Sequence, residues 1–594
     1  MFKASYIITL LSGIGLFNSC TGNFLSLSKY QEAPVVFENE SLYGNYLVGR
    51  VAHIRQDYDV AAKYYVKSIE KGFTNNDIIG KTYIILASQG HIDDAVKYAN
   101  MAKENGDKNN FIDIINAVHD FKLKNYKKAR KQINNISEKT YKNLISPLFN
   151  AWSYVGEKDY AGAKKELQRI SDINEMRMVY LIHRGLIAEY FGFDDEAKSF
   201  YNAVINNENA DISFRALQII SNFLVREGQK DRAVSLVNKY YTSSNMKEML
   251  SNLLEKINNS DEKTASIVNT PDIGISEVFL EVALLFKAVP VGYDYAQMYI
   301  SLSQYFNPNN DIAKLAMADI YEEREMFDEA NRYYDAISKK SEIYYPAQIK
   351  KANNLSAQKK YDEAIRVLKK VSRATPNNFQ VLSNIGDILR ISNNQQDAIK
   401  YYNEAIKSIF YESERHWPVY YALAVSYDRN NEWEKAEENL QKALKLSNRN
   451  PQVLNYLGYS WLKHNTDINK AASFILEAYE KEPNDGVIID SLGWVYFNIG
   501  DYQKAISYLE KASELNPQNA IISDHLGDAY WLGGRKYEAV FLWKQALTQK
   551  EEYEELNTKR VKQKIQNGLR NFKTLTITDE SVKKSLHSLN DITE

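Results

Sequence analysis

The sequence is poor in the residues that build disulfides, thiolate metal sites and flexible linkers. It has one cysteine, Cys20, and 11 prolines in 594 residues. A single thiol excludes an intramolecular disulfide and a zinc site made of several thiolates. The length alone would suggest several domains, yet the body of the chain lacks the Pro/Gly/Ser-rich linkers that usually separate them. A continuous repeat array accounts for both observations.

An excess of positive charge is also missing. Lys and Arg together number 74, against 76 for Asp and Glu, which gives a formal net charge of -2. The chain therefore has no overall basic field to hold a phosphate backbone, and nucleic acid is not an expected partner. With 44% hydrophobic and 25% charged residues, the composition is typical of folded, soluble proteins.

The first twenty residues contain an apolar stretch. Residues 4–19 are mostly apolar and follow Lys3. The stretch has the length of a signal-peptide core and is shorter than the roughly 20 residues that a membrane-spanning helix needs. It ends Leu16-Phe17-Asn18-Ser19-Cys20, which resembles the lipobox of bacterial lipoproteins, although Phe17 and Asn18 depart from its usual residues.

The lipobox resemblance implies a signal peptide at 1–20, lipidation of Cys20 and a leader or tether at 21–40. Thr21 after the cysteine favours the outer membrane under the sorting rule of some bacteria. Two acyl chains would also be physically reasonable, because one chain alone binds a membrane only marginally. An ordinary cleaved signal, or an uncleaved anchor with an unmodified thiol, remains the alternative.

Alanines recur in the body of the chain at a nearly constant spacing. A first series steps by 34, 34, 34, 34 and 36 residues, and a second by 34, 34, 34, 38, 35, 34 and 34. Each alanine follows a short polar turn that apolar residues flank at helical spacing. The repeating unit is therefore predicted to be a helix, a turn and a second helix. The marked alanines are Ala61, Ala95, Ala129, Ala163, Ala197, Ala233, Ala296, Ala330, Ala364, Ala398, Ala436, Ala471, Ala505 and Ala539.

The three C-terminal units share further positions, with Leu-Gly on the first helix and two alanines on the second. They contain Leu457, Gly458, Ala471, Ala478 and Pro483, then Leu492, Gly493, Tyr496, Ala505, Ala512 and Pro517, then Leu526, Gly527, Tyr530, Ala539 and Ala546. This pattern resembles the tetratricopeptide repeat, a helical hairpin of 34 residues, over roughly 41–550. The resemblance implies an all-α fold, a right-handed superhelical solenoid of about 14 hairpins with a C-terminal capping helix.

One irregularity in the spacing predicts the organisation of the array. Ala233 and Ala296 are 63 residues apart, and the polar stretch Asn258–Thr270 between them is followed by Pro271. A flexible break is therefore expected there. The predicted parts are an N-terminal array 41–257, a loop or break 258–275, a C-terminal array 276–550, a capping helix 551–570 and a tail 571–594.

Motifs for common enzyme chemistry are missing. The sequence has no glycine-rich phosphate loop, dinucleotide fingerprint, paired-histidine zinc helix or nucleophile elbow. Its histidines share no metal-ligand spacing, and each is read as a solvated or core residue. No catalytic residue, cofactor, metal or small-molecule substrate is therefore predicted. The histidines are His53, His91, His119, His183, His416, His464, His525 and His587.

The resemblance implies that first helices line a concave face that holds a peptide or helix of another protein. In the last three units, aromatic residues alternate with carboxylates at the positions that face inward. Rings there could bury partner side chains and acids could pair with Lys or Arg, so a basic or amide-rich peptide is expected. Alternatively, Asp490 and Asp524 serve their helix dipoles and Trp531 closes the last layer. The candidate protein-binding residues are Asn455, Tyr459, Asp490, Trp494, Phe497, Asp524, Asp528 and Trp531.

Together these features predict a non-catalytic scaffold that mediates protein–protein interactions in a bacterial cell envelope. The expected location is a periplasm-facing membrane lipoprotein, with the outer membrane favoured. Two alternatives stay open. One is an accessory or regulatory subunit of an envelope enzyme complex, such as a peptidoglycan or polysaccharide synthase. The other is an adaptor anchored in the inner membrane that faces the cytoplasm.

Overall fold

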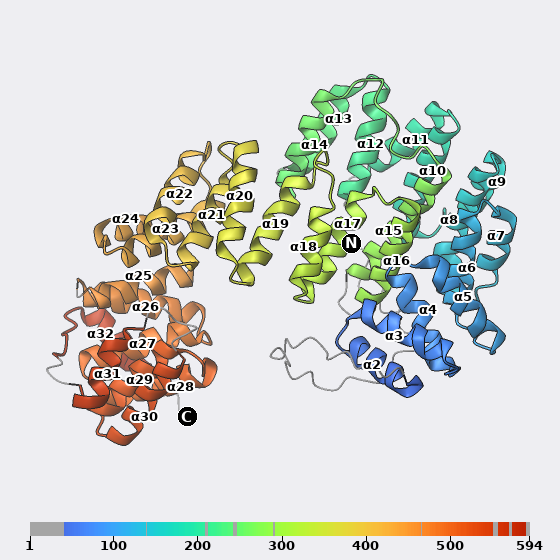
Figure 1. The fold of residues 1–594 in the computed structure, drawn as a ribbon. Helices are drawn as coiled ribbons and strands as arrows, with labels where there is room; N and C mark the ends of the chain where they lie inside the picture. The colour runs from blue at the N-terminus through green and yellow to red at the C-terminus, as the bar shows by residue number, and fades with distance from the viewer. Residues whose placement is uncertain are drawn as a thin grey trace. The chain divides into compact units, whose positions relative to one another are not determined.

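The computed structural model describes residues 41–137, 139–207, 212–241, 246–288, 292–464, 466–549, 556–569 and 573–589. All regular elements in these ranges are helices, so the predicted all-α class is confirmed (Figure 1). The predicted signal peptide, Cys20 and the leader 21–40 lie outside them. The chain divides into two compact units, Met1–Lys359 and Lys360–Glu594.

The first unit consists mainly of antiparallel helix pairs in sequence order. Its α-helices are α2 Leu42–Ile54, α3 Tyr58–Glu70, α4 Asn76–Ser88, α5 Ile92–Glu104, α6 Asn110–Lys122, α7 Tyr126–Asn134, α8 Lys139–Gly156, α9 Tyr160–Gln168, α10 Arg177–Tyr190, α11 Asp194–Ile205, α12 Phe214–Arg226, α13 Lys230–Tyr241, α14 Lys247–Asn259, α15 Pro271–Lys287, α16 Tyr293–Phe306, α17 Asp311–Glu323, α18 Phe327–Asp335 and α19 Tyr344–Ala357.

The second unit continues the same arrangement and ends in two further helices. Its α-helices are α20 Tyr361–Ala374, α21 Phe379–Ile391, α22 Gln395–Lys407, α23 Trp417–Arg429, α24 Trp433–Leu446, α25 Pro451–Lys463, α26 Ile468–Lys481, α27 Gly486–Ile499, α28 Tyr502–Leu515, α29 Ala520–Leu532, α30 Lys536–Thr548, α31 Thr558–Asn567 and α32 Glu580–Ser588. Of the predicted capping helix 551–570, α31 is the helical part that the structure describes. The tail 571–594 contains α32.

The marked alanines explain why the helices pair. Each lies on the second helix of a pair, and all of them have no exposed surface. A small side chain at this position allows the first helix to come close. In two of the C-terminal pairs the opposite residue is glycine: a Cβ on Gly458 would lie 3.0 Å from the carbonyl oxygen of Ala471, and one on Gly527 3.2 Å from that of Ala539. The predicted hairpin packing is therefore confirmed.

The turn inside each pair has a regular backbone feature. A residue with positive φ precedes the buried alanine by five positions in most pairs. It is glycine at Gly90 and Gly500, but lysine at Lys124 and Lys158. The left-handed conformation lets the chain reverse between two helices, and glycine adopts it at lower cost than other residues. The polar turns of the sequence therefore reflect backbone geometry.

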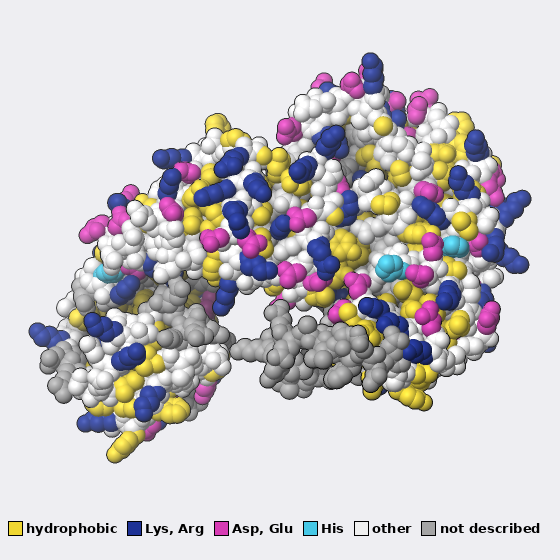
Figure 2. All heavy atoms as spheres, viewed as in Figure 1, with side chains coloured by type: hydrophobic (Ala, Val, Ile, Leu, Met, Phe, Trp, Pro, Cys, Tyr) yellow, Lys and Arg dark blue, Asp and Glu magenta, His cyan; other side chains and the backbone are white. Residues whose placement is uncertain are grey.

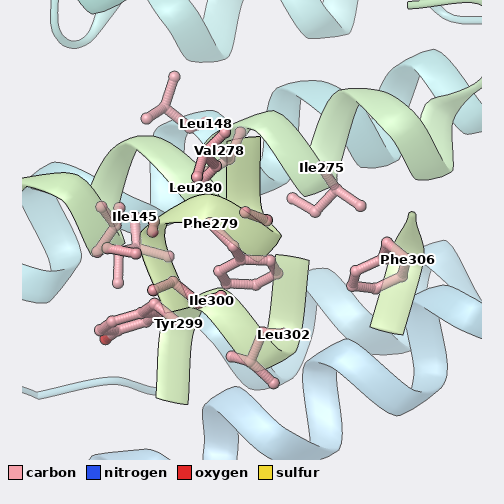
Figure 3. Packing of buried hydrophobic residues seen from close by; sticks show 14 of the residues in the cluster. Ile145, Leu148, Ile275, Val278, Phe279, Leu280, Tyr299, Ile300, Leu302 and Phe306 are labelled. Atoms are coloured by element: carbon pink, nitrogen blue, oxygen red, sulfur yellow. The ribbon is translucent and has the colours of Figure 1, made fainter. Parts of the chain in front are cut away.

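The segment predicted as a break lies inside the first unit. Residues 260–270 carry no helix, but residues 271–275 belong to α15. The division into units falls after Lys359, between α19 and α20, and not at 258–275. Helix α15 is an apolar helix with buried residues on all its sides, and Phe279 is fully buried among Ile145, Leu148 and Phe306 (Figure 3). Because α15 is apolar, it forms part of the hydrophobic core of the first unit.

Helices α15 and α16 pack against the first helices of earlier pairs. Phe121 of α6 meets Phe306 of α16 at 5.4 Å between ring centroids. His183 of α10 lies between Trp152 of α8 and Glu281 of α15, with Trp152 Nε1 donating to His183 Nδ1 at 2.9 Å. The face of α4 to α12 that the family resemblance assigns to a ligand is therefore covered by this chain's own helices.

Candidate functional site

The predicted binding residues all lie on first helices of the second unit. Helix α25 carries Asn455 and Tyr459, α27 carries the next three, and α29 carries the last three. Side chains capping the N-termini of these helices fix where each begins, as Asp485 does by accepting from the backbone N–H of Val487 at 2.8 Å. The spacing of the hairpins then places the three helices next to one another along the array.

Half of the predicted residues are buried in the unit. Asn455, Asp490, Phe497 and Asp528 are each less than a tenth exposed. Asp490 contacts His525 of α29, whereas Asp528 contacts Trp543 of α30 and Lys564 of α31. The buried residues therefore support the surface and do not form it. The half-buried residues are Tyr459, Trp494, Asp524 and Trp531.

An aromatic stack joins α25, α27 and α29. The ring of Trp494 lies 4.0 Å from that of His525 and 4.5 Å from that of Phe497, nearly parallel to both. His525 Nδ1 is 3.0 Å from both carboxylate oxygens of Asp490, and its Nε2 is 3.5 Å from Tyr459 Oη. His525 thus orients Trp494 and Tyr459. The sequence predicted that His525 is a solvated or a core histidine, and its burial agrees with the second alternative.

The acidic pair at the end of the array already has a cation. Lys564 of α31 places its Nζ 2.8 Å from both carboxylate oxygens of Asp524 and 2.8 Å from Asp528 Oδ2. Lys564 is only 3% exposed, and Asp528 also accepts from Trp543 Nε1 at 2.9 Å. The role expected for a basic partner at these two residues is therefore filled by the chain itself.

The electrostatics of this cluster are unusual for a protein surface. Burial raises the pKa of Asp528 to about 6, the charge of Asp524 acts in the same direction, and the Lys564 ammonium opposes both. Sequence reasoning missed Lys564, because α31 carries three other cations at Lys559, Arg560 and Lys562. Only its position between Val561 and Ile565, on the apolar side of the helix, could have distinguished it.

The described part of the chain offers no sign of a metal centre or a membrane span. No group of three or more His, Cys, Asp or Glu side chains there could hold a metal ion. Among the described helices, none combines the length and the apolar composition that crossing a bilayer requires. On the face seen in Figure 2, Lys and Arg side chains alternate with Asp and Glu, in agreement with the balanced charge.

Comparisons with known proteins agree with the hairpin geometry. Family models described as tetratricopeptide repeat match residues 349–410, 417–450 and 491–519. The TPR repeat-containing protein PA4667 of Pseudomonas aeruginosa is 25% identical over 157 residues, 26% of each chain. The BBSome complex member BBS4 of Bos taurus is 28% identical over 141 residues, 24% of this chain and 26% of that one. The matched region thus spans about a quarter of these curated relatives.

Solved structures resemble the chain more loosely. In the crystal structure of the APC/C hetero-tetramer Cut9-Hcn1, the similar chain is 15% identical, with coverage of 89% of this chain and 96% of that chain and a TM-score of 0.36. Yeast Tom70 is 16% identical, with coverage of 80% and 98% and a TM-score of 0.32. The family matches, read with the buried alanines and paired helices, show that the chain contains tetratricopeptide repeats, which indicate a scaffold for protein–protein interaction.

Proposed function

We propose that this protein is a non-catalytic scaffold of a bacterial cell envelope that binds a protein partner through the second unit. The observation that carries the binding proposal is the stack of Trp494 on His525, which holds a half-buried ring in a fixed orientation on the first helices. Fixed aromatic side chains bury partner surface at little cost in conformational entropy, and they dominate many interfaces.

The proposed partner carries basic side chains. The cluster around Lys564 supports this choice, because it shows which cation the acids at the end of the array accept from their own chain. Asp490 next to the stack adds a carboxylate, although His525 engages it. A partner lysine or arginine would therefore compete with Lys564 for Asp524. Its alkyl chain would pack on the exposed edge of the half-buried Trp494, because His525 and Phe497 stack on the faces of that ring.

A matched pair of tryptophans tests the binding surface. Trp433 stacks on His464 at 4.5 Å, and His464 Nε2 is 2.7 Å from Asp428 Oδ1, which repeats the Trp–His–Asp arrangement on a different hairpin. After crosslinking in the native cell, we expect Trp494→Ala to reduce recovery of the partner and Trp433→Ala to retain it. Equal recovery with both variants would contradict the proposed surface.

Attachment to the membrane is proposed from Cys20 and the apolar stretch 4–19 alone. Expression with the native leader, followed by mass spectrometry of the N-terminus, should find a lipidated Cys20, and Cys20→Ser should release the chain from the membrane fraction. An intact Met1 with cytoplasmic partners would favour the adaptor of the inner membrane. A catalytic protein recovered with the chain would favour the accessory subunit of an envelope enzyme.

A further inference from the structure

The first described helix of the first unit, α2, has an exposed apolar face. Among the described helices, no other carries more than two exposed large hydrophobic side chains. Single exposed hydrophobic residues are ordinary on soluble proteins, whereas a contiguous patch of them marks an interaction surface. The exposed hydrophobic residues of α2 are Tyr43, Leu47, Val48, Val51 and Ile54.

Part of this face forms one wall of a groove of about 1000 Å³ within the first unit. The groove lies between α2 and α18, and the turn 55–60 also lines it. Buried Tyr321 lies at its base, and its ring is 5.6 Å from that of Tyr333 and nearly parallel to it. The apolar residues of the two walls are Leu47, Val48, Val51, Met326, Tyr333 and Ala336.

Few charged groups of the groove lack a partner. Arg332 pairs with Glu329 at 2.9 Å, and Asp57 caps α3 by accepting from a backbone N–H at 3.2 Å. Arg55 and Asp59, at the C-terminal end of α2, line the groove and have no ion pair among the described residues. An occupant that fits is therefore mainly apolar, with charged groups at one end.

The chain that leads into α2 is long enough to reach this groove. Ser41 caps α2 by accepting from the backbone N–H of Gly44 at 2.9 Å. An extended chain advances about 3.3 Å per residue, so Phe37 can fold back about 13 Å from the cap. This exceeds the distance of about 9 Å along α2 to Leu47, since a helix rises about 1.5 Å per residue.

The composition of that segment matches the groove. Residues 35–37 are Val-Val-Phe, and Glu32 precedes them. Val35 can fold back about 20 Å from the cap, beyond the distance of about 15 Å along α2 to Val51. The apolar residues can therefore reach the apolar wall, and Glu32 can reach the end of α2 at which Arg55 is unpaired.

We infer that residues 32–40 of the same chain, which lie outside the described residues, dock in this groove and run antiparallel to α2. Val35 and Phe37 pack on the exposed apolar wall. Pro34 biases the residue before it toward extended conformations, and β-branched residues follow it, so the sequence suits a narrow groove. Even a weak contact suffices, because a short connection gives an effective concentration on the order of millimolar.

Docking of this segment shortens the connection to Cys20. Of the predicted tether 21–40, only residues 21–31 are left to extend, over about 36 Å in place of about 66 Å. Together with the proposed attachment at Cys20, this holds the first unit near the membrane surface. The docking itself does not depend on lipidation, because the groove and the segment belong to one chain.

Maleimide labelling tests whether the groove is occupied. Single cysteines are introduced into the full chain with Cys20→Ser, which removes the natural thiol. Leu47 and Tyr43 lie on the same helix and are 56% and 67% exposed, but only Leu47 lines the groove. We expect Leu47→Cys to react about tenfold or more slower than Tyr43→Cys, as burial under two apolar side chains implies. Equal rates would overturn the inference.

Changes in the segment test whether it is the occupant. Val35→Asp with Phe37→Asp should restore the labelling rate at Leu47→Cys, because charged side chains do not dock on an apolar wall. Ser26→Asp with Ser28→Asp adds the same charge outside residues 32–40 and should leave the rate low. A cysteine that stays slow after the first pair of changes would show that another molecule covers the groove, and would overturn the inference.

Disulfide crosslinking identifies which copy of the chain supplies the segment. In the Cys20→Ser chain, Phe37→Cys is combined in turn with Leu47→Cys, Val51→Cys and Tyr43→Cys. A disulfide needs Cα atoms about 4.4–6.8 Å apart, so we expect a groove position to form an intramolecular disulfide faster than Tyr43→Cys, although Tyr43 is nearer in sequence. A faster disulfide at Tyr43→Cys, or crosslinked dimers from the segment of a second copy, would overturn the inference.

Discussion

Replacing Lys564 with methionine tests the acidic cluster at the end of the second unit. The substitution keeps an unbranched side chain and removes the ammonium that three carboxylate oxygens share at 2.8 Å. Removing one partner of a buried ion pair typically costs about 3–5 kcal/mol, because the other charge is left buried and uncompensated. In this variant the uncompensated buried charge would be that of Asp528, which is only 1% exposed.

Protonation of Asp528 limits this cost and makes it depend on pH. Its pKa is already raised to about 6, so taking up a proton costs about 1–2 kcal/mol at pH 7 and about 2–3 kcal/mol at pH 8. The lost contact with Asp524 adds about 1.5–3 kcal/mol, because it is charge-assisted. We therefore expect Lys564→Met to lower the free energy of unfolding by about 3–4 kcal/mol at pH 7 and by about 1 kcal/mol more at pH 8.

The sign of the pH effect follows from proton binding. In the variant, folded Asp528 holds a proton that the unfolded chain has already released above about pH 4, so the free energy of unfolding falls as the pH rises. In the unchanged protein, Asp528 is ionised in both states above pH 6 and the effect is absent. The difference between the two proteins should therefore grow from pH 6 to pH 8.

Urea titration followed by tryptophan fluorescence measures this loss. Six of the seven tryptophans lie after Lys360, and Trp531 and Trp543 adjoin the cluster. Lys562→Met on the exposed side of the same helix is the control, and a surface substitution should change stability by no more than about 0.5 kcal/mol. Equal losses for the two lysines, or a loss at Lys564 that does not vary with pH, would refute the reasoning.

Three further changes test the packing of the first unit, each by urea denaturation followed by circular dichroism. Gly274→Ala should lower the free energy of unfolding by about 1–3 kcal/mol through overpacking, because the added Cβ would lie 2.1 Å from the ring of Trp152. Gly80→Ala is the control and should not lower it, because no atom lies nearer than 3.9 Å to the added Cβ. Trp152→Phe should cost about 1–3 kcal/mol, because His183 Nδ1 loses its buried donor. Lys158→Gly should raise the free energy of unfolding by up to about 1 kcal/mol, because Lys158 has a φ of 62° that glycine adopts more easily. A lower free energy of unfolding in this variant would contradict the strain argument.

The hairpins could be predicted because their determinants are local. An alanine such as Ala471 and the glycine opposite it, Gly458, come from the two helices of one pair, so the buried alanine recurs with every pair and leaves a period in the sequence. The division after Lys359 has no such mark. The step from Ala330 to Ala364 across it is a regular 34 residues, so the spacing gives no sign of a boundary. The irregular spacing before Ala296 drew attention to residues 258–275, of which 260–270 carry no helix and 271–275 begin the buried helix α15.

The coverage of the first helices could not be predicted, because it depends on contacts between distant segments. Glu281 meets His183 across 98 residues, and Lys564 meets Asp524 across 40. A single sequence shows that α15 is apolar, but an apolar helix can pack in many places. The predicted residues of the last hairpins were correctly assigned to first helices, yet half of them are buried because neighbouring helices cover them.

This coverage changes where a partner can bind. In the first unit, α15 and α16 fill the face that a peptide would otherwise occupy, and they do so with buried rings and a Trp–His–Glu contact rather than with a loosely held segment. In the second unit, Lys564 of the single helix α31 pairs with Asp524 and Asp528. A partner that competes for Asp524 must displace α31 and meet the cost worked out above, whereas a partner that binds Trp494 need not. The stack at Trp494 is therefore the surface that favours binding in the second unit.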